Sequence, residues 1–225
     1  KKPFKRILLT GAAGGLGKVL RDRIKPWADI VRLSDISDIG EAREGAEIVK
    51  CDLSDKAAVL ALMEGVDAVL HFGGISTEAP FEAIMQANIL GVANLYEAVQ
   101  KAGVKRVIFA SSNHAIGYYR TTDTVDASMP TRPDSMYGIS KCFGESMSRY
   151  YYDRFGIETV CIRIGSSFPE PINKRMMTTF FSYDDLTEML RCSLFAPRVV
   201  LGLEPVDGHR DHLAALLVDE PRRPR

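Results

Sequence analysis

Tyr137 and Lys141, in the segment YGISK, are the first residues of this sequence whose types and spacing suggest acid–base chemistry. Residues four positions apart share one face of a helix, so the phenol and the ammonium would lie side by side. A phenol titrates near pH 10 in water, and bringing its pKa to about 7 takes roughly 4 kcal/mol of differential stabilisation. A nearby ammonium favours the phenolate. The pair therefore predicts a tyrosine base assisted by a lysine, although this spacing also arises by chance.

A glycine-rich segment, TGAAGGLGK, follows the first apolar run, RILLT. Gly11, Gly14 and Gly17 recur at three-residue intervals, and a helical pattern comes next. Glycine lets the chain turn tightly and approach a phosphate, and the free N–H groups of the helix start can face a pyrophosphate. The alternative is a tight strand-to-helix turn without a ligand. The strand, turn and helix together favour a dinucleotide site.

Carboxylates end the next two apolar runs. Asp35 lies 18 residues beyond Gly17, where the adenosine ribose of a bound dinucleotide is expected. A carboxylate there accepts hydrogen bonds from both ribose hydroxyls and repels a 2′-phosphate, and SDISD contains no basic residue. The expected cofactor is therefore NAD and not NADP, unless Asp35 only caps a helix or a turn. Asp52 and Leu53 are expected to flank the adenine, although Asp52 is equally suited to cap a helix.

Short β-rich runs alternate with longer helical patterns up to about residue 167. The runs cover 6–10, 29–35, 47–53, 68–74, 106–112 and 158–167, and helices are expected near 15–25, 55–64, 80–102, 134–155 and 183–195. Each crossover between parallel strands places a helix on a sheet face. The predicted fold class is α/β, a Rossmann-like doubly wound parallel sheet in a single domain over residues 1–225. Residues 168–225, with a short strand in RVVLGL, are expected to cap its carboxyl edge.

The carboxyl ends of these strands converge on the crevice where such sheets bind ligands. Ser112, in the segment SSN, closes the fifth run and so belongs beside the predicted tyrosine base. Its hydroxyl would hold a substrate oxygen against the phenolate of Tyr137. The positive nicotinamide of the cofactor would add to the effect of Lys141.

Composition sets the class of partner. Lys plus Arg and Asp plus Glu both number 29, so the formal net charge is zero. The chain has no excess of positive charge with which to bind nucleic acid or an anionic membrane, and the expected partner is a small molecule. The cysteines show no paired metal-ligand spacing, and no apolar run is long enough to span a membrane. We expect a cytoplasmic protein with reduced cysteines and no metal; the cysteines are Cys51, Cys142, Cys161 and Cys192.

The segments TGAAGGLG, HFGG, SSNHAIGYY and YGISK together resemble the extended short-chain dehydrogenases/reductases, and within them the bacterial uronate dehydrogenases. The likeness runs from about residue 5 to residue 198. It implies that Ser112, Tyr137 and Lys141 form the catalytic trio, with Lys141 also holding the nicotinamide ribose. It also implies NAD-dependent oxidation of the C1 hydroxyl of cyclic glucuronate or galacturonate to an aldarolactone.

The same resemblance implies further site residues. Those implied to line the cofactor, beside the residues already named, are Gly15, Leu16, Ile36, Ser37, Gly73, Gly74 and Ile164. Those implied to grip the sugar acid, with Ser112, are Ser76, Asn113, His114, Ser166 and Arg175. A guanidinium at Arg175, on a short loop, would hold the C6 carboxylate with two parallel hydrogen bonds. The wider family pairs through the helices near 80–102 and 134–155, so a homo-oligomer, a dimer or larger, is expected.

Other interpretations stay open. A nucleotide-sugar epimerase or dehydratase would share the fold and the trio, although few residues follow Ser167 to enclose a nucleoside diphosphate. A non-catalytic NAD-sensing module would usually lack the tyrosine or the lysine. His114 also suits a capping or core position, Asn113 a turn, and Arg175 a solvated loop, while Arg163 is expected in a buried pair.

The last residues depart from the family pattern. His209 and His212 lack a third metal ligand and are expected at the surface. From about residue 199 the sequence differs from the expected carboxyl-terminal region and ends early. We therefore expect lower stability or a different assembly than in full-length relatives.

Overall fold

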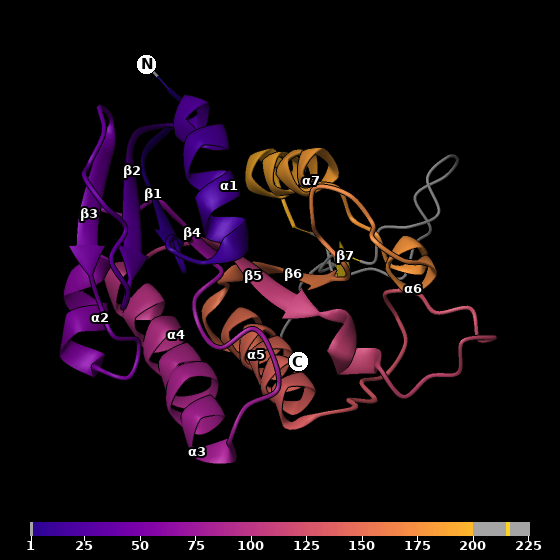
Figure 1. Cartoon of the computed structure of the whole chain (residues 1–225). Helices are drawn as coiled ribbons and strands as arrows, with labels where there is room; N and C mark the ends of the chain where they lie inside the picture. Colours follow the sequence, from indigo (N-terminus) through magenta and orange to yellow (C-terminus); the bar gives the residue numbers. More distant parts are fainter. Residues whose placement is uncertain (1, 200–214, 217–225) are drawn as a thin grey trace.

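The computed structural model describes residues 2–199 and 215–216, which contribute to one seven-stranded sheet (Figure 1). The strand order is β3-β2-β1-β4-β5-β6-β7, and every neighbouring pair is parallel except β6 with β7. The strands are β1 (Phe4–Thr10), β2 (Ala28–Asp35), β3 (Ala46–Lys50), β4 (Ala68–His71), β5 (Arg106–Ser112), β6 (Glu158–Ile164) and β7 (Ala215–Leu216). The reversal of strand order between β1 and β4 is that of a doubly wound sheet, which confirms the predicted fold class.

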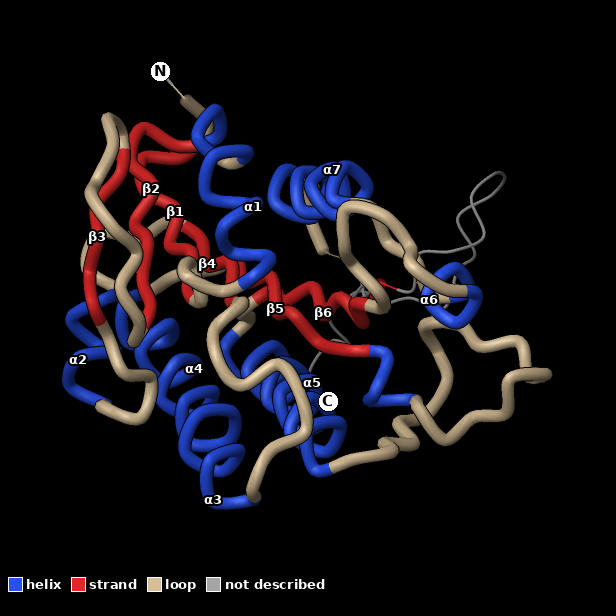
Figure 2. Tube along the Cα trace, viewed as in Figure 1, coloured by secondary structure: helices blue, strands red, loops and turns tan. Residues whose placement is uncertain are grey.

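Helices cover both faces of the sheet (Figures 1 and 2). On one face lie α1 and α7, and on the other lie α2, α4 and α5. The α-helices are α1 (Gly15–Arg23), α2 (Lys56–Leu62), α3 (Phe81–Ile84), α4 (Gly91–Ala102), α5 (Met136–Phe155), α6 (Lys174–Thr178) and α7 (Tyr183–Phe195). The other helical segments are the 3-10 turns η1 (Lys25–Trp27) and η3 (Asn113–Ile116) and the π-helical turn η2 (Met85–Leu90).

The central strands are apolar in continuous runs because both of their faces are covered. In β1, Ile7 and Leu9 belong to the core beneath α1 and α7, whereas Leu8 between them belongs to the core on the α2 and α4 side. All three are fully buried. This alternation is the period of two expected for a strand with two buried faces.

The structure corrects several predicted boundaries. The strands expected over 47–53, 68–74 and 158–167 each end three residues early, because the chain turns into the loops that form the cleft. The helix expected over 80–102 is divided into α3, the π turn η2 and α4. The strand expected in RVVLGL lies almost wholly outside the described residues.

Helix α7 has the predicted bounds, but it does not lie over the carboxyl edge. Its residues Leu186, Leu190 and Leu194 recur every four positions and pack in the same core as Leu20 and Ile24 of α1. Part of the region expected to cap the sheet edge therefore covers a sheet face. The segment before α7, which includes α6, borders the cleft, and Tyr183 and Met189 of α7 also line it.

Candidate active site

A long cleft follows the carboxyl ends of the strands, and every predicted site residue lines it. The cofactor set in the cleft is Gly11, Gly14, Gly15, Leu16, Gly17, Asp35, Ile36, Ser37, Asp52, Leu53, Gly73, Gly74 and Ile164. The substrate and catalytic set is Ser76, Ser112, Asn113, His114, Tyr137, Lys141, Ser166 and Arg175. The structure therefore brings these residues together, and their individual roles remain predictions.

The glycine-rich turn forms a cradle whose close backbone packing leaves no room for side chains at Gly11 and Gly17. Gly11 has φ +73°, and a Cβ atom there would lie 2.4 Å from the Phe72 carbonyl oxygen. A Cβ atom on Gly17 would lie 2.0 Å from the Gly11 carbonyl oxygen, whereas one on Gly15 meets nothing within 4 Å. Gly14 caps α1 without a side-chain hydrogen bond, and the first turn of α1 holds no acidic residue. The open backbone and the positive end of α1 therefore suit a pyrophosphate.

Asp35 ends β2 at the entrance to this cradle. One carboxylate oxygen accepts a hydrogen bond from the Ala13 backbone N–H at 3.0 Å, and the other accepts from the Ser37 N–H at 2.9 Å. The bond to Ser37 makes a turn, so that alternative holds as well. Each carboxylate oxygen still has acceptor capacity for a ribose hydroxyl. Asp35 therefore anchors the glycine-rich loop as well as lining the cleft.

Asp52 is not the helix cap considered from the sequence. Its Oδ1 accepts hydrogen bonds from the backbone N–H and the hydroxyl of Ser54, both at 2.8 Å. The N-cap of α2 is Asp55, which accepts from Ala57 and Ala58. The Asp52 carboxylate lines the cleft at the end of β3.

Tyr137 and Lys141 lie on the first turns of α5 with their side chains buried against β5. The Lys141 Nζ donates a hydrogen bond to the Ala110 carbonyl oxygen at 2.9 Å and lies 5.4 Å from the centre of the Tyr137 ring. Burial lowers the pKa of Lys141 to about 8. Burial also raises the pKa of Tyr137, and a hydrogen bond with the Ser112 side chain opposes that rise. The phenol, the ammonium and the serine hydroxyl thus meet at the end of β5.

Ser112 ends β5 and caps the short turn η3. Its Oγ accepts a hydrogen bond from the His114 backbone N–H at 3.2 Å. Asn113 begins the turn, and the His114 ring stands edge-on to the Tyr137 ring with centroids 5.6 Å apart. His114 is neither a cap nor a core residue, because its side chain is 40% exposed and lines the cleft.

Arg175 and Ser166 border the cleft from the segment between β6 and α7. Arg175 was expected on a loop, but it lies in the one-turn helix α6, whose N-cap Asn173 accepts a hydrogen bond from the Met176 N–H at 2.9 Å. The Arg175 side chain is exposed. Ser166 is paired by its backbone and its hydroxyl with Thr179, so the two ends of this segment are fastened together.

Long-range contacts add positioning residues that the sequence did not indicate. Glu78 accepts hydrogen bonds from the backbone N–H groups of Met136 and Tyr137, at 3.3 and 2.9 Å. Asn88, in the π turn, accepts from the Ile75 N–H at 2.8 Å and donates to the Ser140 hydroxyl at 2.9 Å. Both side chains fasten the loop after β4 to α5. The sequence carries no specific signal for either residue: Asn88 and Asn94 are both asparagines inside the predicted helix over 80–102, and both are buried in the structure.

Arg163 makes the buried pair expected of it. Two of its nitrogens donate to the two Glu145 carboxylate oxygens at 3.0 and 2.9 Å, and a third donates to the Met129 carbonyl oxygen at 3.3 Å. Ser111 donates to the same carboxylate at 2.6 Å. The pair therefore joins β5, β6, α5 and the loop before α5 beside the cleft.

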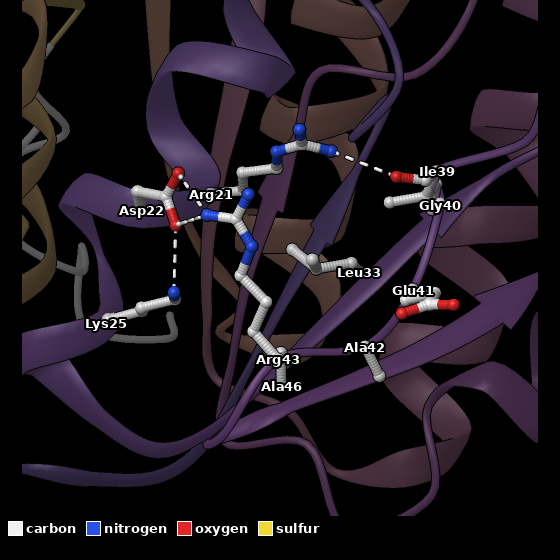
Figure 3. Close-up of a pocket in the computed structure, with 10 residues that line it drawn as sticks. All are labelled: Arg21, Asp22, Lys25, Leu33, Ile39, Gly40, Glu41, Ala42, Arg43 and Ala46. Carbon is white, nitrogen blue, oxygen red and sulfur yellow. Dashed lines mark hydrogen bonds and ion pairs between the residues drawn. The ribbon is translucent and has the colours of Figure 1, made fainter.

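A second, smaller hollow lies between α1 and the connection from β2 to β3 (Figure 3). Asp22 pairs with Lys25 at 2.8 Å and with Arg43 at 3.4 Å, and Arg21 donates to the Ile39 carbonyl oxygen at 3.1 Å. The hydrogen bond from Lys25 lowers the pKa of Asp22. These contacts fasten the connection from β2 to β3 onto α1, and the hollow shares no lining residue with the cleft.

Residues 7–183 match the family model described as the NAD dependent epimerase/dehydratase family. This chain belongs to that family. It is 61% identical over 198 residues to uronate dehydrogenase of Pseudomonas syringae pv. tomato, covering 88% of this chain and 72% of the relative. It is 52% identical over 205 residues to uronate dehydrogenase of Agrobacterium fabrum, covering 91% and 77%.

Solved structures give the same relationship. A mutant uronate dehydrogenase from Agrobacterium tumefaciens complexed with NAD matches with a TM-score of 0.84 and 50% identity, over 86% of this chain and 73% of that one. The Thermus thermophilus UDP-glucose 4-epimerase complex with NAD matches with a TM-score of 0.73 at 22% identity, over 85% and 75%, which shows the fold alone. The predicted resemblance to uronate dehydrogenases is confirmed, as is the predicted NAD-dependent oxidoreductase class.

Some predictions fall outside these observations. His209, His212 and the departure from the family pattern after about residue 199 lie outside the described residues. Within residues 2–199 and 215–216, no group of three or more His, Cys, Asp or Glu side chains is placed to hold a metal ion. None of the helices in this part of the chain has the length and apolarity to cross a membrane.

Proposed function

We propose that this protein oxidises the C1 hydroxyl of a cyclic hexuronate, glucuronate or galacturonate, to the aldarolactone with NAD as the acceptor. The observation that carries the proposal is the meeting of Tyr137, Lys141 and Ser112 in a cleft that Arg175 borders. The high identity to curated uronate dehydrogenases supports the choice of substrate class.

The cofactor-binding part of the proposal follows from the cradle at the start of α1. The backbone of Gly14 and Gly15 and the helix N-terminus would hold the pyrophosphate, and Asp35 would accept hydrogen bonds from the ribose hydroxyls. Lys141 would hold the nicotinamide ribose. When bound, NAD supplies the hydride acceptor and a positive nicotinamide. All of these residues line one continuous cleft.

The catalytic step assigns one role to each member of the trio. Ser112 holds the C1 hydroxyl, and the Tyr137 phenolate removes its proton as the hydride leaves C1. The burial that raises the pKa of Tyr137 opposes the phenolate. Lys141, whose Nζ is 5.4 Å from the Tyr137 ring centre, supplies the positive charge that offsets this cost.

Arg175 gives the proposal its sugar-acid specificity. A guanidinium holds a carboxylate with two parallel hydrogen bonds, which a neutral CH₂OH group does not match. Arg175 lines the cleft and makes no ion pair shorter than 4.0 Å with another described residue. It is therefore available for the C6 carboxylate. The substrate's other hydroxyls would meet Ser76, Asn113, His114 and Ser166.

The experiment that tests the function is a substrate panel. The protein is incubated with NAD and, separately, glucuronate, galacturonate, glucose, galactose and UDP-glucose, while NADH is followed by absorbance. NADH formation with the two uronates, and little with the neutral sugars, is the expected result. Equal rates with glucose and glucuronate would remove the role of the carboxylate. Turnover of UDP-glucose alone would point to a nucleotide-sugar enzyme.

The assembly proposed with this function is a homo-oligomer. Met136, Ile139 and Tyr150 are exposed along α5, and Phe81 and Met85 are exposed on α3 and η2 beside it. Apolar side chains gathered over neighbouring helices mark a subunit contact. A second copy of the chain, bound through these helices, would cover them. The unpaired cysteines agree with a cytoplasmic location.

A further inference from the structure

His114 shares its ring proton with a carboxylate that the function described above does not use. The His114 Nδ1 lies 2.8 Å from one oxygen of Asp134 and 3.1 Å from the other. The two side chains are 40% and 26% exposed, so the ring is bound on one edge and open to the cleft on the other. A neutral imidazole has one donor nitrogen and one acceptor nitrogen, and the partner of one nitrogen decides the character of the other.

Asp134 lies between two donors, His114 and Ser135, and acts as an acceptor toward both. Ser135 caps α5, and its Oγ accepts from the Gly138 backbone N–H at 3.0 Å. Its single hydroxyl proton is therefore available for Asp134 Oδ1, which lies 3.0 Å away. An ionised carboxylate only accepts hydrogen bonds. In the neutral imidazole the proton between His114 and Asp134 thus belongs to Nδ1, and Nε2 keeps a lone pair.

Gly117 leaves the space that this carboxylate occupies. A Cβ atom on Gly117 would lie 2.1 Å from Asp134 Oδ2 and 2.3 Å from its Cγ. The glycine has φ −65°, a conformation that any residue adopts, so its backbone does not require glycine. The close approach of Asp134 does require it. A methyl group at residue 117 would therefore displace Asp134 without changing either partner.

We infer that Asp134 is a positioning residue that fixes His114 in the Nδ1–H form, so that Nε2 accepts a hydrogen bond from a substrate hydroxyl. The identity of the substrate in this inference rests on the proposed function. Because the His114 ring stands against the Tyr137 ring, the hydroxyl that it receives lies near the reacting carbon. In the opposite tautomer, Nε2 would carry the proton and donate a hydrogen bond. The substrate hydroxyl would then have to accept that bond and donate its own proton to another group.

The tautomer is measured directly by NMR, without cofactor or substrate. The whole chain is labelled with ¹⁵N-histidine and studied at about pH 8, where an ordinary imidazole is neutral. The chain holds four histidines, and the His114→Gln variant identifies the His114 signals. We expect an N–H signal at Nδ1 and an unprotonated signal at Nε2. An Nε2–H form in the parent protein would overturn the inference.

Variants separate this role from a structural one. Asp134→Ala should move the proton to Nε2, which is the form that free histidine favours in water. Gly117→Ala should do the same with both partners present, and it keeps the test valid if Asp134→Ala does not fold. Ser135→Ala removes the helix cap but leaves Asp134, so it should lower thermal stability and keep the Nδ1–H form. An unchanged tautomer in both Asp134→Ala and Gly117→Ala would refute the inference.

Kinetics test what the tautomer does. Asp134→Ala should raise the KM for glucuronate by about fivefold or more, as expected for one lost hydrogen bond. The KM for NAD should stay the same, because Asp134 does not line the glycine-rich cradle. A shifted tautomer with an unchanged glucuronate KM would refute the recognition role. If the parent protein oxidises no uronate, the proposed function fails, while the NMR result still decides the role of Asp134 in setting the tautomer.

Discussion

Replacing Lys141 by methionine removes the charge beside Tyr137 while keeping much of the side-chain volume. The Lys141 Nζ lies 5.4 Å from the centre of the Tyr137 ring. Taking this ring-centre distance as a rough charge separation and an effective dielectric constant of about 20, the ammonium favours the phenolate by about 3 kcal/mol, or roughly two pKa units. We therefore expect the pKa that controls uronate oxidation to rise by about two units in Lys141→Met. At pH 7 the value of kcat/KM should fall about a hundredfold.

The assay is the pH dependence of kcat/KM for glucuronate at saturating NAD, from pH 6 to pH 10. The parent profile should reach its plateau at lower pH, whereas the Lys141→Met rate should still be rising at the upper end. Lys105→Met is the matched control. Lys105 is exposed and directly precedes β5, so it lies at the amino ends of the strands, opposite the cleft. A loss in Lys141→Met that is equal at every pH would show that the lysine only orients the cofactor. It would refute the electrostatic role.

The same substitution should stabilise the fold. Burial lowers the pKa of Lys141 from 10.5 to about 8, so between these values the unfolded chain binds more protons than the folded one. The free energy of unfolding therefore rises with pH across this window, and the full cost of the buried charge is present below pH 8. That cost is about 3 kcal/mol. Lys141→Met should raise the urea midpoint at pH 7, and a lower midpoint would contradict this assignment.

Three further predictions follow from the site. Arg175→Ala should lower kcat/KM for both uronates at least about tenfold, because a charge-assisted contact is lost, while Lys174→Ala should change it little; equal effects would place the carboxylate elsewhere. Asp35→Asn should weaken NAD binding without creating a preference for NADP, because the variant loses an anchor to the Ala13 N–H and gains no cation, as titration with each cofactor would show. Burial lowers the pKa of His71 to about 3, so this side chain stays neutral in the folded protein, and the free energy of unfolding should fall as pH drops from 6.5 toward 3. Urea titrations at several pH values should show a flatter pH dependence in His71→Gln. An unchanged slope would exclude His71 as its source.

The features that the sequence predicted are those set by local pattern. Continuous apolar runs marked strands with two buried faces, and the glycines after β1 marked a turn that side chains would block. The four-residue spacing of Tyr137 and Lys141 placed both on one face of α5. Asp35 was placed correctly, because a strand end in this fold has one position relative to the crevice.

The features that the sequence did not predict depend on contacts between distant segments. Glu78 meets the first turn of α5 across a separation of 58 or 59 residues, and Asp134 meets His114 across 20. Arg175 was expected on a loop, because a five-residue helix is too short to produce a periodic pattern. The division of the 80–102 helix at η2 also had no periodic signal, because a π turn inserts only a local change of hydrogen bonding.

The most direct test of the central claim follows the hydride itself. The protein is incubated with NAD and glucuronate carrying deuterium at C1, and the products are analysed by NMR. Our account predicts deuterium at C4 of the reduced nicotinamide, an aldarolactone as the sugar product, and loss of both in Tyr137→Phe while NAD still binds. Deuterium that stays on the sugar, or a Tyr137→Phe variant that transfers it as fast as the parent, would contradict the proposed reaction and the role of its base.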